Sequence, residues 1–285
     1  MESEHPVEDD LFSFGVTYPS PTELITFVFG NRRRLDHIAN LVQAGGLAGY
    51  EAPTPGVLIS LCRDQPGLVL DIGANTGLFS LLAAAASPEV EVVAFEPLAP
   101  VRKLLEENLR LNPALSRRVR VEPFGLSRSE GDFPFYETIN DFGLVTTSSS
   151  LELDHVRQVG QYREHRIMTR TLDDWASALT GPPVRVIKCD VEGHEHAVLE
   201  GGWRTLSEHR PFVVVEVLGA VETGIHDRLL HELGYLDFAL APGAVRQCTS
   251  VRFHPDAWNH LLVPAERAAR MFSMCRQLGL ALNLG

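Results

Sequence analysis

Short, almost continuously apolar runs alternate with helix-like segments over most of the chain, and this pattern limits the possible fold more than any other feature. Such β-branched runs are typical of strands buried on both faces of a parallel sheet. They stand at "LVLDIG", "VEVVAFEP", "VRVEPFG", "VRVIKCD" and "FVVVEV". The helix-like segments are Gly77–Ala86, Ala99–Leu111, His194–Leu206 and Ile225–Leu233. The alternation predicts an α/β fold with a doubly wound, mostly parallel sheet.

The segments around this pattern suggest three parts. Apolar residues between Thr22 and Cys62 recur at helix-like spacing, so we expect an N-terminal helical cap over residues 1–65. Residues 66–264 would form the sheet domain, with "YLDFAL" and "NHLLVP" as an antiparallel pair and an antiparallel last strand. Residues 265–285 would form an amphipathic C-terminal helix, which could pack within the chain or form a homodimer contact.

One polar interval, residues 128–170, interrupts the alternation of strands and helices. It is rich in Ser, Thr and Asp, and it contains "GDFPFYET" and "HRIMTRT", which we expect to be the strands of a hairpin. A long insertion in an α/β domain is usually functional or disordered. We therefore expect this interval to be a lid over the substrate.

Charge and cysteine content exclude several classes of protein. The formal net charge of −12 argues against a nucleic-acid partner, because affinity for phosphates depends on clustered Lys and Arg. The apolar stretches are shorter than the roughly 18 residues of a membrane span, and the acidic N-terminus lacks a signal-peptide core. Four widely spaced cysteines indicate free thiols, and neither disulfides nor a zinc site. We expect a soluble, cytoplasmic protein.

A glycine-rich turn follows the first apolar run, in "LVLDIGANTGLFS". Ligands of doubly wound sheets bind at the carboxyl ends of the strands, where glycine lets them approach the backbone. The spacing of Gly73 and Gly77 is not the three-glycine form that binds a dinucleotide diphosphate. Asp71 at the strand end would suit an ammonium group, and Glu96 after the next strand could accept hydrogen bonds from ribose hydroxyls. Together they favour S-adenosylmethionine over NAD.

Several motifs resemble those of the FkbM-type methyltransferases. They are "YEAP", "VLDIGANTGLFS", "AFEP", "TLDDW", "KCDVEGHEHAVLEGG" and "LLVP", which occur in the order and spacing of that family. The resemblance covers roughly residues 50–264. It implies a class I methyltransferase fold with a Rossmann-like sheet, S-adenosylmethionine as methyl donor, and O-methylation of a small molecule such as a sugar, glycoside or macrolide. It also assigns cofactor-binding roles to Asp71, Gly73, Asn75, Gly77 and Glu96, and it places the adenine ring near Pro123–Ser127, which includes Phe124 and Ser127.

Methyl transfer from a sulfonium to a hydroxyl needs alignment of the two groups and a means of removing the proton. Asp190, at the end of the strand "VRVIKCD", is our first choice for the catalytic base. Lys188 lies on the same side of that strand and needs an acidic partner, either Asp190 or Glu216. Asp190 and Glu216 could instead hold Mg²⁺ through their oxygens, and the sequence leaves both possibilities open.

The segment after Asp190 supplies further candidates. The family pattern D-V-E-G-x-E is matched by Asp190, Glu192 and Glu195, and it leaves both histidines outside. His194 and His196 are two residues apart, about 200° around a helix, so we expect that they cannot face one site. His194 remains a weak catalytic candidate and His196 is expected to be solvated or packed. His260 is a further weak candidate for the base.

Two other functions use the same sheet and stay open at this stage. A nicotinamide-dependent oxidoreductase would need the three-glycine turn, which is absent. A methyltransferase-like binding module without catalysis would not need Asp71, Glu96 and Asp190 together. We therefore favour an S-adenosylmethionine-dependent O-methyltransferase, with an acceptor that the sequence does not identify.

Overall fold

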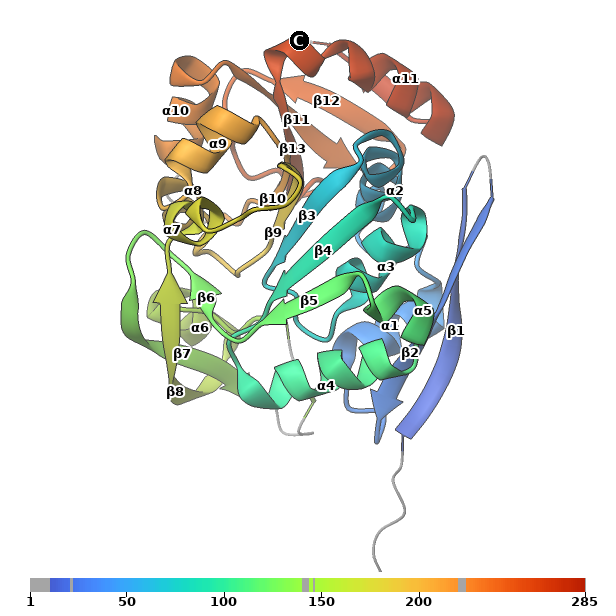
Figure 1. Ribbon diagram of the computed structural model, residues 1–285, viewed down its shortest axis with the longest axis vertical. Coiled ribbons are helices and arrows are strands. Elements are labelled where there is room, and N and C mark those ends of the chain that lie inside the picture. Colours follow the sequence, from blue (N-terminus) through green and yellow to red (C-terminus); the bar gives the residue numbers. More distant parts are fainter. Residues whose placement is uncertain (1–10, 21–22, 140–143, 146, 220–223, 285) are drawn as a thin grey trace, which may run out of the picture.

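A nine-stranded sheet forms the centre of the computed structural model (Figure 1), which describes residues 11–20, 23–139, 144–145, 147–219 and 224–284. The strand order is β14-β12-β11-β13-β10-β9-β3-β4-β5. The strands are β3 (Gly67–Ile72), β4 (Val90–Phe95), β5 (Val119–Glu122), β9 (Val184–Cys189), β10 (Phe212–Glu216), β11 (Tyr235–Ala241), β12 (Ala244–Cys248), β13 (Asn259–Pro264) and β14 (Ala281–Asn283).

The pairing of these strands confirms the predicted fold class. β5, β4, β3, β9 and β10 pair in parallel, whereas β13 runs antiparallel to both β10 and β11. From β3 the sheet grows in one direction through β4 to β5, and the chain then returns to add β9 on the other side of β3. The strand order therefore reverses beside β3. In a doubly wound sheet this reversal leaves a crevice at the carboxyl ends of the central strands, where ligands bind.

Helices cover both faces of the sheet, which explains why its strands are apolar at almost every position. On one face, α2 (Thr54–Asp64), α3 (Leu78–Ala86), α4 (Ala99–Arg110) and α11 (Ala269–Leu278) contribute to one core, together with α1 (His37–Gly45). On the other face, α7 (Leu172–Ser177), α8 (Glu195–Glu200), α9 (Trp203–His209) and α10 (Gly224–Glu232) contribute to a second core. A short helix, α5 (Pro113–Ser116), precedes β5. Within β3, Val69 belongs to the first core and Leu70 to the second.

The N-terminal part contains helices α1 and α2, as expected for a helical cap, but the helical prediction is wrong for its first apolar residues, Leu24–Val28. This segment belongs to a hairpin of β1 (Leu11–Pro19) and β2 (Leu24–Arg32). Ile25, Phe27 and Phe29 are buried, so the apolar positions follow the two-residue period of a strand. Because Val28 and Leu24 also carry apolar side chains, the sequence pattern could be mistaken for a helical stripe.

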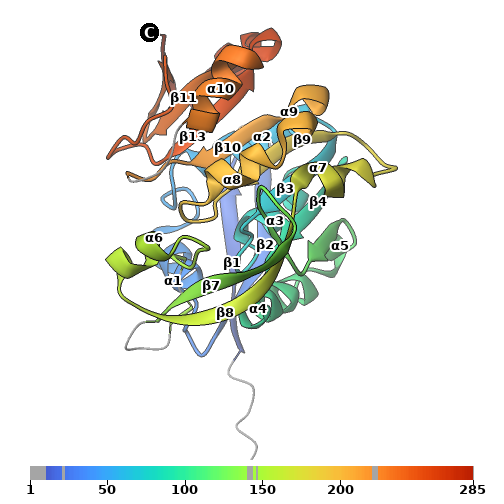
Figure 2. The ribbon, with the colours of Figure 1, turned by 90° about the vertical axis from the view of Figure 1, so that its left-hand side faces the viewer.

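The polar interval forms a second small sheet beside the carboxyl ends of the central strands (Figure 2). Its strands are β6 (Gly125–Leu126), β7 (Gly131–Ile139) and β8 (Gln161–Arg170), and α6 (Leu153–Val159) lies between β7 and β8. The antiparallel pairing of β7 with β8 confirms the predicted hairpin. The backbone of Val145 in this interval donates a hydrogen bond to Leu35, just before α1, and accepts one from His37, the first residue of α1.

The C-terminal region differs in part from the prediction. β11 and β13 form the expected antiparallel pair. The helix expected over residues 265–285 is shorter, because a 3₁₀ turn, η1 (Ala265–Arg267), precedes α11 and Gly279 ends it at a φ of 66°. The chain then adds β14 to the sheet edge. Among the described helices, none has both the length and the apolar content needed to cross a bilayer.

Candidate active site

Two neighbouring cavities open at the carboxyl ends of the central strands. The first is lined by residues after β3, β4 and β9 together with the insertion, among them Gly73, Glu96, Leu126, Ser149 and His194. The second extends towards α1, the loop before α2 and the segment before β13. Both cavities are lined by Gly73, Asn75, Thr147, Asp190 and Glu192. The loop after β9 therefore stands at the junction of the two cavities.

The glycine-rich turn is shaped by a close approach between two loops. Gly73 has a φ of 82°, and a Cβ added to it would lie 1.8 Å from the carbonyl oxygen of Asp190. Asn75 also has a positive φ, and Gly77 precedes α3 with a φ of 89°. A side chain at Gly73 would thus push the turn away from Asp190. The glycine predicted for ligand approach also brings the candidate base beside the turn.

Asp71 and Glu96 are buried carboxylates, as expected for residues at the strand ends. Asp71 Oδ2 accepts a hydrogen bond from Ser80 Oγ at 2.5 Å, and it lines the second cavity. Glu96 lines the first cavity and accepts hydrogen bonds from the backbone of Asn75 (3.1 Å) and Leu98 (2.8 Å). Burial raises the pKa of Glu96 to about 7, despite these hydrogen bonds. A bound group with hydroxyl donors would lower that pKa again.

Phe124 and Ser127 lie close to the first cavity without lining it. Phe124 packs against Phe95, with ring centroids 5.7 Å apart, and the neighbouring Gly125 and Leu126 line the cavity instead. Ser127 is buried, and its hydroxyl lies 2.9 Å from His194 Nε2. The segment from Pro123 to Ser127 therefore reaches the cavity through different residues from those named by the sequence analysis.

Asp190 and Lys188 form the ion pair that the strand pattern allowed. Lys188 Nζ lies 2.6 Å from Asp190 Oδ2, and Lys188 also lies over the ring of Phe79. Burial acts to lower the pKa of Lys188, but the charge of Asp190, with those of Glu51 and Asp71, raises it above its usual value. Lys188 therefore stays charged and holds Asp190 in place at the junction of the cavities.

Glu192 and Glu216 join Asp190 in an acidic cluster. One oxygen from each of these three carboxylates lies within 4.8 Å of the others. Burial and then the charge of Asp190 raise the pKa of Glu216 well above its usual value, and its Oε2 is buried without a hydrogen-bond partner among the described residues. Glu192 pairs with His155 of α6 at 3.4 Å. Burial and mutual repulsion therefore disfavour the charged form of Glu216 beside Asp190.

Glu195 lies beneath the loop and lines neither cavity. Its Oε1 accepts hydrogen bonds from the backbone of Val191 (2.8 Å) and Gly193 (3.3 Å). Burial raises its pKa to about 8. These contacts fix the loop that carries Asp190 and Glu192, so Glu195 is placed to position the site.

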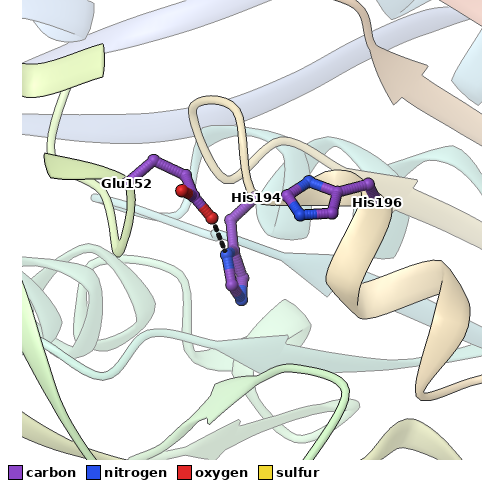
Figure 3. A group of neighbouring side chains, drawn as sticks. All are labelled: Glu152, His194 and His196. Carbon is purple, nitrogen blue, oxygen red and sulfur yellow. Dashed lines mark hydrogen bonds and ion pairs between the residues drawn. The ribbon is translucent and has the colours of Figure 1, made fainter. Parts of the chain in front are cut away.

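The expectation that His194 and His196 cannot face one site is wrong. His194 precedes α8 with a φ of −97° and a ψ of 7°, so the helical angle of 200° does not apply to this pair. The two ring centroids are 5.6 Å apart. Glu152, immediately before α6, lies beside these two rings, and its Oε1 is 2.6 Å from His194 Nδ1 (Figure 3). Sequence spacing alone gave no sign of Glu152, which is 42 residues away from His194.

Other residues of the second cavity were not singled out from the sequence. Glu51 is held by Asn259 Nδ2, which donates to its Oε2 at 3.0 Å, and burial raises its pKa. Trp258 is 55% exposed and lines the cavity. Glu51 belongs to the motif "YEAP", so this motif was the available signal. His260 lies elsewhere, fully buried against Asp237 at 2.8 Å, and lines neither cavity.

The fold and the paired cavities are those of a class I, Rossmann-like protein that binds ligands at its strand ends. Residues 71–236, which include the glycine-rich turn and the loop after β9, match the family model described as the methyltransferase FkbM domain. The chain belongs to the FkbM methyltransferase family.

Curated relatives with the same region carry different names. The chain is 33% identical over 165 residues to the AMB antimetabolite synthetase AmbE of Pseudomonas aeruginosa, and this match covers 47% of this chain and 8% of AmbE. It is 29% identical to the hexuronic acid methyltransferase AglP of Haloferax volcanii, over 59% of this chain and 63% of AglP. It is 26% identical to the 2-O-methyltransferase NoeI of Sinorhizobium fredii, over 59% of this chain and 72% of NoeI. The chain thus spans less than two thirds of the first two relatives.

Proposed function

We propose that this protein is an S-adenosylmethionine-dependent O-methyltransferase that acts on a hydroxyl of a small molecule, most simply a sugar or glycoside. The observation that carries the proposal is the position of Asp190, where the cavity beside Glu96 meets the cavity beside Lys188 and Glu216. One cavity would take the methyl donor and the other the acceptor. Membership of a methyltransferase family supports this reaction over hydride transfer.

The residues on either side of the glycine-rich turn, which borders both cavities, suit the donor chemically. Glu96 offers carboxylate oxygens to ribose hydroxyls, and because burial raises its pKa to about 7, added hydroxyl donors would favour its charged form. The buried carboxylate of Asp71 suits an ammonium group. S-adenosylmethionine would supply a methyl group bound to a sulfonium. When that methyl group is transferred, the sulfur would leave as a neutral thioether. Gly73 and Asn75 shape the wall between Asp71 and Glu96.

The residues at the junction would act on the acceptor. Asp190 would align the hydroxyl and take its proton as the oxygen forms its bond to the methyl carbon. Lys188 would keep the Asp190 side chain oriented through its 2.6 Å contact. Glu192 would line the path between the cavities, and Glu195 would hold the loop. The insertion, which supplies Thr147 to both cavities, would act as the lid.

A sugar-like acceptor is supported by the second cavity and by two relatives. Carboxylate and amide groups of Glu51, Asn259 and Glu192 offer hydrogen bonds to hydroxyls, and the exposed face of Trp258 stands at the same wall. AglP is named for a hexuronic acid and NoeI for 2-O-methylation. Both names fit an acceptor with several hydroxyl groups.

Binding of the reaction product tests the donor site. S-adenosylhomocysteine should bind the purified protein in isothermal titration calorimetry, and Glu96→Gln should weaken its affinity at least about tenfold, because hydrogen bonds to a charged group contribute about 1.5–3 kcal/mol. Glu91→Gln, an exposed residue near the start of the strand that precedes Glu96, should bind like the wild type. Absence of binding to the wild type would overturn the proposed function.

We further propose that Mg²⁺, held by Asp190 and Glu216 with Glu192 beside them, assists removal of the hydroxyl proton. The support is the proximity of the three carboxylates and the unpartnered Oε2 of Glu216. Oxygen ligands of this kind suit a hard divalent cation. A cation there would stabilise the charged form of Glu216 beside Asp190 and lower the pKa of a bound hydroxyl.

Removal of divalent cations is the test of this second proposal. Dialysis against EDTA should lower the rate of methyl transfer at least about tenfold, and Mg²⁺ should restore it. The Glu216→Gln variant should transfer methyl groups slowly, and added Mg²⁺ should not raise its rate. Full activity of the wild type in EDTA would mean that Asp190 removes the proton without a metal.

A further inference from the structure

Glu152, His194 and His196 form a second group of metal-ligating side chains, outside the acidic cluster. One ligand atom from each lies within 4.8 Å of the others. Figure 3 shows the carboxylate of Glu152 directed at the His194 ring, with the His196 ring beside it. Glu152 comes from the insertion, whereas the two histidines flank the start of α8. Two separate parts of the chain therefore meet at this group.

Each imidazole is held through the ring nitrogen that would not bind a metal. His194 Nε2 lies 2.9 Å from Ser127 Oγ, and His196 Nδ1 lies 3.2 Å from the carbonyl oxygen of Gly193. With the rings held in this way, His194 Nδ1 faces Glu152, and His196 Nε2 is the nitrogen of that ring that can bind a metal. Histidines that ligate metals almost always have their other nitrogen fixed in this way, because the contact sets the ring orientation and tautomer.

We propose that Glu152, His194 and His196 bind a divalent transition ion of the zinc class, with water completing the coordination. Two imidazoles and one carboxylate are a ligand set that Zn²⁺ accepts, whereas Mg²⁺ prefers oxygen ligands alone. All three residues are partly exposed or lie at the limit of burial, so an ion can reach them from solvent. Metal binding replaces the 2.6 Å contact between Glu152 and His194 Nδ1, and the proton of His194 then resides on Nε2, facing Ser127.

The position of this site gives the ion a structural role. Glu152 is part of the segment that supplies Ser149 and Leu151 to the first cavity, and His194, from the loop after β9, lines that cavity too. An ion between them ties the insertion to the loop that carries Asp190 and Glu192. The site is separate from the acidic cluster, and the inference does not depend on the proposed reaction.

Direct metal binding tests the site without an activity assay. The full chain, freed of metal by EDTA and desalted, should bind Zn²⁺ in calorimetry and show the visible absorption of tetrahedral Co²⁺ when Co²⁺ replaces it. Glu152→Gln and His196→Gln each remove a direct ligand, so each should weaken binding at least as much as the about 10–100-fold that loss of an outer-shell partner costs. His231→Gln, an exposed histidine of α10, should bind like the wild type.

Three outcomes would overturn the inference. The first is that Zn²⁺ does not bind to the wild type, and the second is that His196→Gln binds Zn²⁺ as tightly as His231→Gln does. The third is that Glu216→Gln loses Zn²⁺ binding while His196→Gln keeps it, which would assign the ion to the acidic cluster. Binding of S-adenosylhomocysteine should persist in Glu152→Gln and His196→Gln, so failure of the metal site is distinct from failure of the donor site.

Hydrogen exchange measures the structural role. Zn²⁺ should slow amide exchange in residues 147–170 of the wild type and leave it unchanged in Glu152→Gln. Equal exchange of the wild type with and without Zn²⁺ would contradict the tie between the insertion and the loop.

Discussion

Replacing Asp190 by asparagine should lower kcat about 10²–10⁴-fold, the range expected when a positioned base is lost. Affinity for S-adenosylhomocysteine should stay close to that of the wild type, because the donor contacts proposed for Glu96 and Asp71 remain. The asparagine keeps the size of the side chain but cannot take a proton, and it removes the charge that faces Lys188 at 2.6 Å. Steady-state kinetics with a hydroxylated acceptor, together with calorimetry, measure the two quantities separately.

The control for this variant is Asp154→Asn, whose side chain is 94% exposed on α6. It should leave kcat unchanged. Since Asp190→Asn leaves the ammonium of Lys188 buried without its closest partner, the thermal transition of the variant must be compared with the wild type. Equal losses of kcat and of affinity for S-adenosylhomocysteine in a folded variant would place Asp190 in the donor pocket and contradict its role as the base.

Replacing Gly73 by alanine should have the largest effect on stability and on donor binding together. The new Cβ would lie 1.8 Å from the Asp190 carbonyl oxygen, and the residue would also have to keep a φ of 82°. Positive φ alone costs an ordinary residue about 1–2 kcal/mol, and a clash with backbone adds about 1–3 kcal/mol or more. We expect unfolding at a clearly lower denaturant concentration and loss of measurable S-adenosylhomocysteine binding.

Gly243→Ala separates the two causes. Gly243 has a φ of 77°, nearly that of Gly73, but a Cβ there would meet no atom within 4 Å. It should therefore lose only about 1–2 kcal/mol of stability and bind S-adenosylhomocysteine normally. If the two alanine variants were equally stable and bound equally well, the close approach of the turn to Asp190 would not matter.

The central sheet and its ligand edge could be predicted because their sequence signals are local. Strands buried on both faces read as short apolar runs, and the residues at their ends, such as Asp71, Glu96 and Asp190, follow directly. The hairpin of β1 and β2 was missed because Ile25, Phe27 and Phe29 lie among other apolar residues, so the two-residue period was hidden.

The parts of the candidate site that are assembled from distant segments could not be predicted from local sequence signals. Glu51 approaches Asn259 across 208 residues of sequence, and Glu152 approaches His194 across 42. The judgement on the two histidines failed for a more specific reason. It assumed helical geometry at His194, whereas the helix begins only at Glu195 and the preceding loop contains Glu192 at a φ of 56°.

The walls of the second cavity come from three separate stretches, residues 37–52, 147–155 and 255–259, while its floor comes from the strand ends. Most of these wall residues lie outside the strands of the central sheet. Changes in them can therefore alter the shape and charge presented to an acceptor without moving Asp71, Glu96 or Asp190. If the proposed function holds, exchange of these three stretches between family members is a route to new acceptor selectivity on an unchanged donor site, and it makes the cavity wall a natural target for directed evolution.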